Sequence, residues 1–287
     1  MDLCSIQEIR PLLERHGFHF SKARGQNFLT AAWVPERIAA ESRLDESCGV
    51  LEIGPGVGCL TKELARRAGR VVAVEVDKRL PDVLAESLAD CDNVEIVCGD
   101  ILRLDIPALV REKLPGLTPV VCANLPYNIT TPVLTALLDA RLFASINVMV
   151  QREVARRLCA APDTADYGAF TIYVNYFAEP RILFDVAPGC FIPQPKVTSS
   201  VIRLVPRKTP AVPVRDEALF FRTVRAAFAQ RRKTLANALA AGFPEVGKAG
   251  AADVIAACGL PPQIRGEALD LAAFARLADA LAAQKNS

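Results

Sequence analysis

Five short apolar runs, separated by segments of helical periodicity, occupy residues 46–150. The runs are nearly continuous in apolar side chains, and several are rich in β-branched residues, which is typical of strands buried on both faces of a parallel sheet. They cover residues 50–53, 70–75, 94–98, 119–123 and 146–150. This alternation predicts an α/β domain with a mostly parallel, doubly wound sheet.

The pattern changes after Gln151. Residues 181–186 and 199–205 are expected to form strands, whereas residues 169–178 are compatible with either helix or strand. The stretch 188–195 between the two strands contains three prolines. It predicts a stiff loop, because proline cannot extend a ladder of hydrogen bonds.

A second domain is indicated toward the end of the chain. Three prolines in residues 206–213 are typical of a linker, and the alanine-rich segment beyond them has helical periodicity. We therefore expect a large domain over residues 1–205 and a small α-helical domain over 206–287. The second carries twelve Lys and Arg against seven Asp and Glu, a net charge of +5, while the first has −3. This asymmetry favours a polyanionic partner.

Composition excludes several classes of protein. The 287 residues are 51% hydrophobic and 23% charged, so the chain can bury a substantial core and is not disordered throughout. Because no run approaches the roughly 18 apolar residues of a membrane span, we expect no membrane partner and a cytoplasmic location. The nine cysteines are odd in number and lack C-x-x-C spacing, so we expect reduced side chains and no metal.

A glycine-rich turn follows the first apolar run and opens a helical segment. Gly54, Gly56 and Gly58 have the spacing G-x-G-x-G, and such a turn lets the backbone approach a ligand closely. Glu75 ends the next strand and can accept both hydroxyls of a ribose, and Asp100 follows the third strand and can accept from an adenine amino group. Glu52 lies just before the turn, and together with the G-x-G-x-G spacing, in place of G-x-G-x-x-G, it favours S-adenosylmethionine (AdoMet) over a dinucleotide. The alternatives are a solvated carboxylate for Glu75 and a helix N-cap for Asp100.

The most specific motif is Asn124-Leu125-Pro126-Tyr127, at the end of the fourth apolar run. The exocyclic amine of adenine is a poor nucleophile because its lone pair is delocalised into the ring. A side-chain carbonyl and a backbone carbonyl that accept its two N–H groups localise that pair toward a methyl donor. Asn124 offers the amide oxygen, the Leu125-Pro126 bend offers the backbone carbonyl, and Tyr127 offers a stacking face.

These motifs together resemble the KsgA/RsmA-type ribosomal RNA adenine N6,N6-dimethyltransferases. The likeness covers nearly the whole chain. It rests on the segments Gly25-Gln26-Asn27-Phe28-Leu29, Glu52-Ile53-Gly54-Pro55-Gly56-Val57-Gly58, Asn124-Leu125-Pro126-Tyr127, Phe191-Ile192-Pro193-Gln194-Pro195-Lys196-Val197-Thr198-Ser199-Ser200-Val201 and Phe228-Ala229-Gln230-Arg231-Arg232-Lys233-Thr234-Leu235. The resemblance implies a Rossmann-like AdoMet-dependent methyltransferase fold with a small α-helical C-terminal domain, and it favours a helix over residues 169–178.

The resemblance also implies roles for individual residues. The AdoMet site would include Asn27 and Leu29 from the segment that precedes the first apolar run, here called the lead-in segment, and Gly54 and Gly56 from the glycine turn. It would also include the strand-end carboxylates Glu75 and Asp100, and Asn124, which would lie between cofactor and target. The catalytic residues would be Asn124, Pro126, Tyr127 and Phe191. Of these, Tyr127 and Phe191 would hold a flipped adenine between aromatic faces, while Phe28 is a stacking or a core residue. Phosphate contacts would come from Arg222, Arg225, Arg231, Arg232 and Lys233, for which the alternative is a solvated helix face.

The activity that the resemblance implies is methyl transfer from AdoMet to N6 of two adjacent adenines near the 3′ end of 16S rRNA in the small ribosomal subunit. Each adenine would be methylated twice, as a late ribosome-assembly step, by a monomer. One alternative is an antibiotic-resistance enzyme that dimethylates large-subunit rRNA, although Leu125 and the segment 228–235 favour the small-subunit enzyme. Others are an assembly or nucleic-acid-binding factor in which methylation is secondary, and a nicotinamide oxidoreductase.

Overall fold

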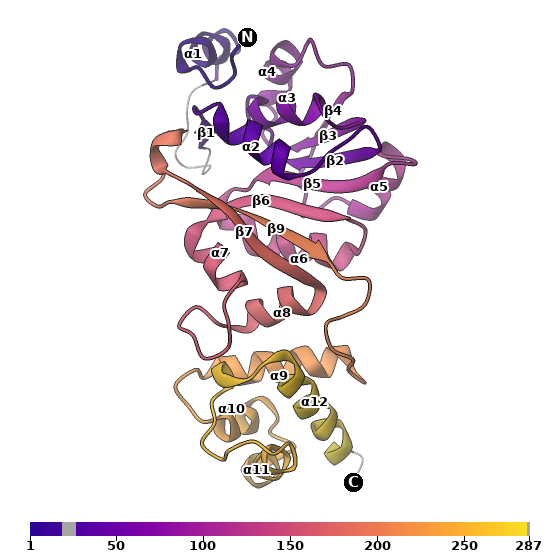
Figure 1. Ribbon diagram of the computed structural model, residues 1–287, viewed down its shortest axis with the longest axis vertical. Helices are drawn as coiled ribbons and strands as arrows, with labels where there is room; N and C mark the ends of the chain where they lie inside the picture. Colours follow the sequence, from indigo (N-terminus) through magenta and orange to yellow (C-terminus); the bar gives the residue numbers. More distant parts are fainter. Residues whose placement is uncertain (19–26, 286–287) are drawn as a thin grey trace. The chain divides into compact units, whose positions relative to one another are not determined.

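The computed structural model describes residues 1–18 and 27–285 (Figure 1). Over these residues a seven-stranded sheet has the order β4-β3-β2-β5-β6-β9-β7. Its strands are β2 (Cys48–Ile53), β3 (Arg70–Glu75), β4 (Val94–Cys98), β5 (Thr118–Asn124), β6 (Ser145–Gln151), β7 (Ala178–Val186) and β9 (Ser199–Pro206). Neighbouring strands from β4 to β6 pair in parallel, and β9 pairs antiparallel with β6. The predicted mostly parallel α/β sheet is therefore confirmed, and each of the five apolar runs is one of its strands.

Helices connect the parallel strands, as the periodicity predicts. They are α3 (Cys59–Ala65), α4 (Leu80–Ser87), α5 (Ile106–Lys113), and the 3-10 turn η2 (Tyr127–Ile129) with α6 (Thr130–Ala140). Helices α1 (Ile6–Arg15) and α2 (Trp33–Glu41) precede β2, and α7 (Arg152–Leu158) follows β6. Strand β2 lies inside the sheet, and all six of its residues are buried. Because strands this apolar must be covered on both faces, the connecting helices supply the cover and the carboxyl edge of the sheet stays available for a site.

The proline-rich segment after β7 contains a short strand that the sequence analysis did not predict. The 3-10 turn η3 (Pro188–Cys190) leads into β8 (Phe191–Ile192), which pairs antiparallel with β1 (Phe28–Leu29). The expectation of an unpaired stiff loop was therefore wrong at these two residues. Their neighbours Pro188 and Pro193 lie outside the paired positions, so the missing proline N–H groups cost no ladder hydrogen bond.

The described chain divides into two compact units, residues 1–155 with 181–206, and residues 156–180 with 207–285. The second unit holds α8 (Ala169–Phe177), α9 (Glu217–Ala229), α10 (Leu235–Gly242), α11 (Gly247–Ala257), η4 (Gly266–Ala268) and α12 (Leu271–Lys285). The segment 169–178, which the sequence left open and the resemblance favoured as a helix, is helical over α8.

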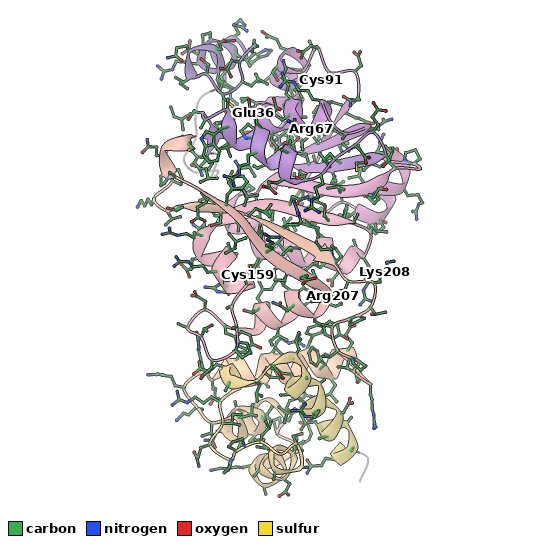
Figure 2. The ribbon with its side chains drawn as sticks, in the orientation of Figure 1. Glu36, Arg67, Cys91, Cys159, Arg207 and Lys208 are labelled. Atoms are coloured by element: carbon green, nitrogen blue, oxygen red, sulfur yellow. The ribbon has the colours of Figure 1, made fainter. Side chains whose placement is uncertain are left out.

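The helical unit is larger than the sequence analysis expected, because residues 156–180 pack within it rather than with the sheet. The ring centroids of Tyr176 and Phe220 lie 5.0 Å apart, and the hydroxyl of Tyr167 donates to the carbonyl of Leu269 at 2.7 Å. Arg207, which is labelled in Figure 2, is the first residue after β9. Its backbone N–H donates to the carbonyl of Phe177 at 2.7 Å. These aromatic and hydrogen-bond contacts between distant segments cannot be inferred from a composition boundary at residue 206.

None of the described helices is both long and apolar enough to cross a membrane. All nine cysteines fall within the described residues and are free thiols. No cluster of three or more His, Cys, Asp or Glu side chains in the described part of the chain has an arrangement that could hold a metal ion.

Candidate active site

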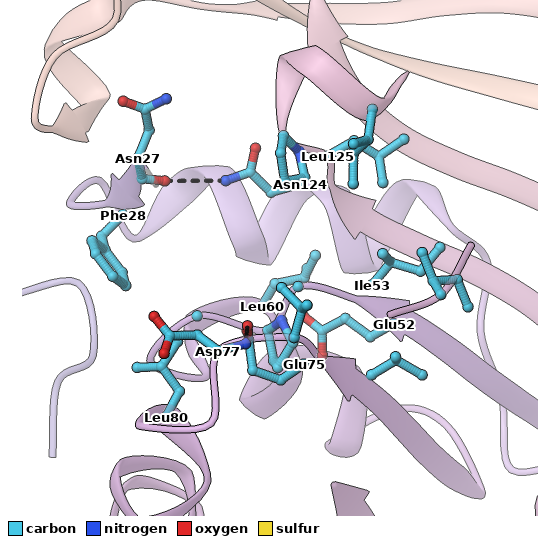
Figure 3. Close-up of a pocket in the computed structure, with 18 of the residues that line it drawn as sticks. Asn27, Phe28, Glu52, Ile53, Leu60, Glu75, Asp77, Leu80, Asn124 and Leu125 are labelled. Carbon is cyan, nitrogen blue, oxygen red and sulfur yellow. Dashed lines mark hydrogen bonds between the residues drawn. The ribbon is translucent and has the colours of Figure 1, made fainter. Parts of the chain in front are cut away.

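A cavity of about 400 Å³ opens at the carboxyl ends of β2, β3, β4 and β5 (Figure 3). Strand β2 has β3 on one side and β5 on the other, so the chain order reverses across it. Crevices at such a reversal are the usual ligand sites of doubly wound sheets. The cavity is lined by the glycine turn after β2, by residues at the ends of the other three strands, and by Asn27, Phe28 and Leu29.

The glycine turn has a backbone that other residues rarely adopt. The φ angles of Gly54, Gly56 and Gly58 are +71°, +61° and +94°. A Cβ at Gly56 would lie 3.4 Å from the ring of Phe28, which packs directly on the turn. Glycine is therefore favoured here by the conformation, while a Cβ at Gly56 would be in ordinary van der Waals contact with Phe28. The lead-in strand and the turn thus form one wall of the cavity.

Glu75 is a buried carboxylate rather than a solvated strand end. It is 5% exposed, and its Oε1 accepts a hydrogen bond from the N–H of Asp77 at 2.8 Å. Burial raises the pKa of Glu75, and hydrogen bonds from the N–H groups of Asp77, Gly56 and Val76 oppose that shift. The N–H of Gly56 bonds to Glu75 at the end of β3. The glycine turn and Glu75, both predicted to bind the cofactor, are therefore held in a fixed position relative to each other.

Asp100 lines the cavity and also begins the turn after β4. Its Oδ1 accepts from the N–H of Leu102 at 3.0 Å, and Arg103 lies 3.6 Å from the other oxygen. No helix begins at Ile101, and the N-cap of the following helix α5 is Asp105, so the alternative of a helix N-cap at Asp100 was wrong. The Asp100 carboxylate has acceptor capacity for a ligand besides its bond to Leu102.

Asn124 has a defined amide orientation. Its Nδ2 lies 3.3 Å from the carbonyl oxygen of Asn27, which can only accept (Figure 3). The side-chain oxygen of Asn124 therefore points away from Asn27 and is available to accept a hydrogen bond from a ligand. The predicted residues Asn27, Leu29, Gly54, Gly56, Glu75, Asp100 and Asn124 all line this one cavity. Gly25 and Gln26 of the lead-in motif fall outside the described residues.

Of the two carbonyls at the bend after Asn124, that of Pro126 is already occupied by hydrogen bonds within the chain. The carbonyl of Pro126 accepts from the N–H of Ile129 at 3.2 Å and from the hydroxyl of Thr130 at 3.3 Å. These two donors match the two lone pairs of a carbonyl oxygen. Pro126 lines the cavity, but its carbonyl has no lone pair left for a further donor.

The two aromatic residues expected to stack on the target differ in their surroundings. Tyr127 lines the cavity and is partly exposed, and its hydroxyl lies 2.8 Å from that of Ser199. Phe191 is only 2% exposed, lies in the hydrophobic core and pairs through its backbone with Leu29. Phe28 is also buried, at an edge-to-face distance of 6.1 Å from Phe18. The structure brings Tyr127 to the cavity and leaves Phe191 behind its wall.

Two acidic residues of the cavity were not assigned as site residues from the sequence. Glu52 is 1% exposed, and its Oε2 has no hydrogen-bond partner among the described residues. Burial raises the pKa of Glu52 to about 8, the hydroxyl of the neighbouring Thr61 opposes that shift, and the Glu75 carboxylate adds to it. Asp77 is 2% exposed and forms an ion pair with Arg79 at 2.7 Å. The sequence signal that could have identified Glu52 and Asp77 as site residues was their position next to the ends of predicted strands.

A family model described as ribosomal RNA adenine dimethylase matches residues 17–254. The chain belongs to this family. The resemblance noted in the sequence is thereby confirmed. This rRNA adenine dimethylase is 46% identical over 285 residues to the ribosomal RNA small subunit methyltransferase A of Geobacillus kaustophilus, covering 98% of this chain and 97% of the relative. It is 44% identical to the protein of the same name from Streptococcus gordonii, with 98% of each chain covered.

Solved structures of related enzymes agree with this membership. A dimethyladenosine transferase from Plasmodium falciparum has a TM-score of 0.75 and 25% identity, covering 87% of this chain and 95% of that one. The 23S rRNA methyltransferase ErmE has a TM-score of 0.67 and 27% identity, covering 89% of this chain and 100% of that one. The Rossmann-like methyltransferase fold is shared with both.

The five basic residues expected to contact RNA fall into two groups within the helical unit. Arg222 contacts Glu245 at 3.2 Å and the carbonyl of Gly242 at 2.8 Å. Arg231 contacts Glu267 at 2.9 Å and the carbonyl of Ala165 at 2.7 Å. These two guanidinium groups help to hold the unit together. The remaining three side chains, Arg225, Arg232 and Lys233, are exposed.

Proposed function

We propose that this rRNA adenine dimethylase transfers methyl groups from AdoMet to N6 of adenine in the RNA of the small ribosomal subunit. The observation that carries the proposal is the orientation of Asn124, whose side-chain oxygen is left available for a target amine in a cavity with buried carboxylates. Identity of 44–46% to small-subunit methyltransferases, against 27% to the large-subunit enzyme, supports the choice of RNA.

The donor set of the cavity fits AdoMet, which supplies an electrophilic methyl group on a positively charged sulfonium. The unpartnered oxygen of Glu52 suits the ammonium group of the methionine moiety, since a buried carboxylate without a donor favours a cationic ligand. The glycine turn leaves room for backbone contacts to the same moiety. Glu75 has a second oxygen for ribose hydroxyls, and Asp100 is placed to accept from the adenine amine.

The target amine is activated by two acceptors and one aromatic face. Asn124 Oδ1 and the carbonyl of Leu125 accept the two N–H groups of N6, which localises the nitrogen lone pair toward the methyl group. Tyr127 stacks on the flipped base, a contact worth about 1–3 kcal/mol. No basic side chain is needed at N6, because the proton it loses after methyl transfer passes to water.

Our proposal extends to the details of the substrate. The enzyme dimethylates two adjacent adenines near the 3′ end of 16S rRNA, late in the assembly of the small subunit, in the cytoplasm. It acts as a monomer. The exposed residues Arg225, Arg232 and Lys233 bind RNA phosphates, and Phe191 faces the target only if the β8 segment moves.

The test is transfer of labelled methyl from AdoMet to undermethylated small subunits, with large-subunit RNA as competitor and identification of the modified nucleoside. We expect dimethyladenosine in small-subunit RNA alone, and loss of turnover with retained AdoMet and RNA binding in Asn124→Ala. Label in large-subunit RNA would replace the proposal by the resistance-enzyme activity. No label despite AdoMet binding would favour a binding or assembly role.

A further inference from the structure

Tyr127 is held at both ends. Its backbone begins η2 directly after the bend that follows β5, and its phenolic hydroxyl lies 2.8 Å from the hydroxyl of Ser199. The tyrosine ring therefore spans from the end of β5 to the start of β9. Both faces of the ring lie to the side of this hydrogen bond, so the bond leaves them available for stacking.

Ser199 is suited to fix the ring, because its own position is set by the sheet. It is the first residue of β9, is 0% exposed, and lies opposite Gln151 in the antiparallel pair with β6. Asn124 lies opposite Met149 of the same strand, two residues before Gln151. Strand β6 thus sets the spacing between the start of β9, where the Tyr127 hydroxyl is bound, and the end of β5, where the target amine is bound.

Ser200, the next residue along β9, provides a natural contrast. Successive side chains of a strand point to opposite faces, and the Ser200 hydroxyl donates to Asp185 at 2.6 Å instead. Ser200 is also 0% exposed. The two serines therefore share residue type, burial and strand, but only Ser199 is bonded to a cavity residue.

We propose that Ser199 is a positioning residue for methyl transfer, which holds the Tyr127 ring in the orientation that stacks the target adenine with its N6 at Asn124. Ser199 does not touch the substrate. Ser199 restricts rotation of the Tyr127 side chain, so that the ring is already in the stacking orientation when the base enters. The inference rests on the proposed function, since it assumes that Tyr127 stacks on the methylated base.

The test compares Ser199→Ala, Ser200→Ala and Tyr127→Phe in the full-length enzyme, with labelled AdoMet and undermethylated small subunits. We expect Ser199→Ala and Tyr127→Phe each to lower kcat about tenfold, because each removes the one hydrogen bond that orients the tyrosine ring. KM for the subunit and the Kd for AdoMet should change little. Ser200→Ala should keep the wild-type kcat while losing as much thermal stability as Ser199→Ala.

A double-mutant cycle separates positioning from a structural role. If Ser199 acts through the Tyr127 hydroxyl, Ser199→Ala should lower kcat no further in the Tyr127→Phe background, and Ser199→Thr, which restores a hydroxyl, should recover part of the rate. Equal loss of kcat in Ser199→Ala and Ser200→Ala, or full additivity with Tyr127→Phe, would overturn the inference. Failure of the wild-type enzyme to label small-subunit RNA would instead count against the proposed function.

Discussion

The side-chain amide nitrogen of Asn124 donates a hydrogen bond to the main-chain carbonyl of Asn27 across 3.3 Å. Asn124 ends β5, and Asn27 directly precedes β1, which pairs with β8. This single bond therefore joins the segment before β1 to the bend after β5, on the wall of the cavity where we propose that AdoMet and the target amine bind. It also decides which end of the Asn124 amide is left for the substrate.

Replacing Asn124 by Asp tests this orientation. The change removes the donor and sets a carboxylate oxygen against the carbonyl of Asn27, so the lead-in segment loses its tie and the target meets a charged group. We expect methyl transfer to fall at least about a hundredfold, as is typical when one oriented polar group is lost from an active site. Single-turnover rates with labelled AdoMet measure this, and calorimetry measures AdoMet affinity. A variant as active as the wild type would show that the amide orientation is not needed.

Gly56→Ala tests the requirement for glycine in the turn. A Cβ at φ +61° is strained, although it would lie at van der Waals distance, 3.4 Å, from the Phe28 ring. We expect a loss of about 1–3 kcal/mol in the free energy of unfolding and weaker AdoMet binding, measured by urea denaturation and calorimetry. Gly189→Ala is the matched control, since a Cβ there meets nothing within 4 Å. Equal effects of both substitutions would contradict the assignment.

Glu52 predicts a specific pH dependence of stability. Its pKa is raised from 4.5 to about 8 by burial, so between these values the folded protein keeps a proton that the unfolded chain has released. This contribution to stability is fully present below pH 4.5 and is lost as the pH rises through about 8. The loss is at most about 1.4 kcal/mol per pH unit.

Urea denaturation of the ligand-free protein between pH 5 and 9 should therefore show a shallower decline in Glu52→Gln than in the wild type. Glu112→Gln, at a side chain that is 70% exposed, should follow the wild type. Since a cationic ligand favours the carboxylate, AdoMet affinity of the wild type should rise over the same range, and Glu52→Gln should reduce that rise. Parallel curves for all three proteins would assign the titration to another group.

The arginines of the helical unit that form ion pairs and those that are only exposed should differ in how their substitution affects thermal stability and RNA binding. Arg231→Ala removes the ion pair with Glu267 and the bond to Ala165, so we expect a lower melting temperature. Arg232→Ala should leave the melting temperature unchanged and weaken RNA binding, with the slope of log affinity against log salt reduced by about one. Thermal melts and binding titrations at several salt concentrations check both. Unchanged RNA binding in Arg232→Ala would remove this residue from the interface.

Much of this protein follows from local sequence. The strands β2 to β6 were predictable because a strand covered on both faces needs an apolar run, and the turn at Gly54 was predictable because its φ angles require glycine. That Gly54, Glu75, Asp100 and Asn124 line one cavity was predictable, since the carboxyl ends of parallel strands meet at one edge of a sheet.

Tertiary structure decided the features that depend on contacts between distant segments. The bond from Asn124 to Asn27, the burial of Phe191 and the tie from Tyr127 to Ser199 each join residues whose separation carries no periodic signal. The unpartnered oxygen of Glu52 is likewise visible only once its neighbours are in place. Periodicity and turn chemistry report on the conformation of a few neighbouring residues, whereas hydrogen-bond partners and burial depend on how the whole chain packs.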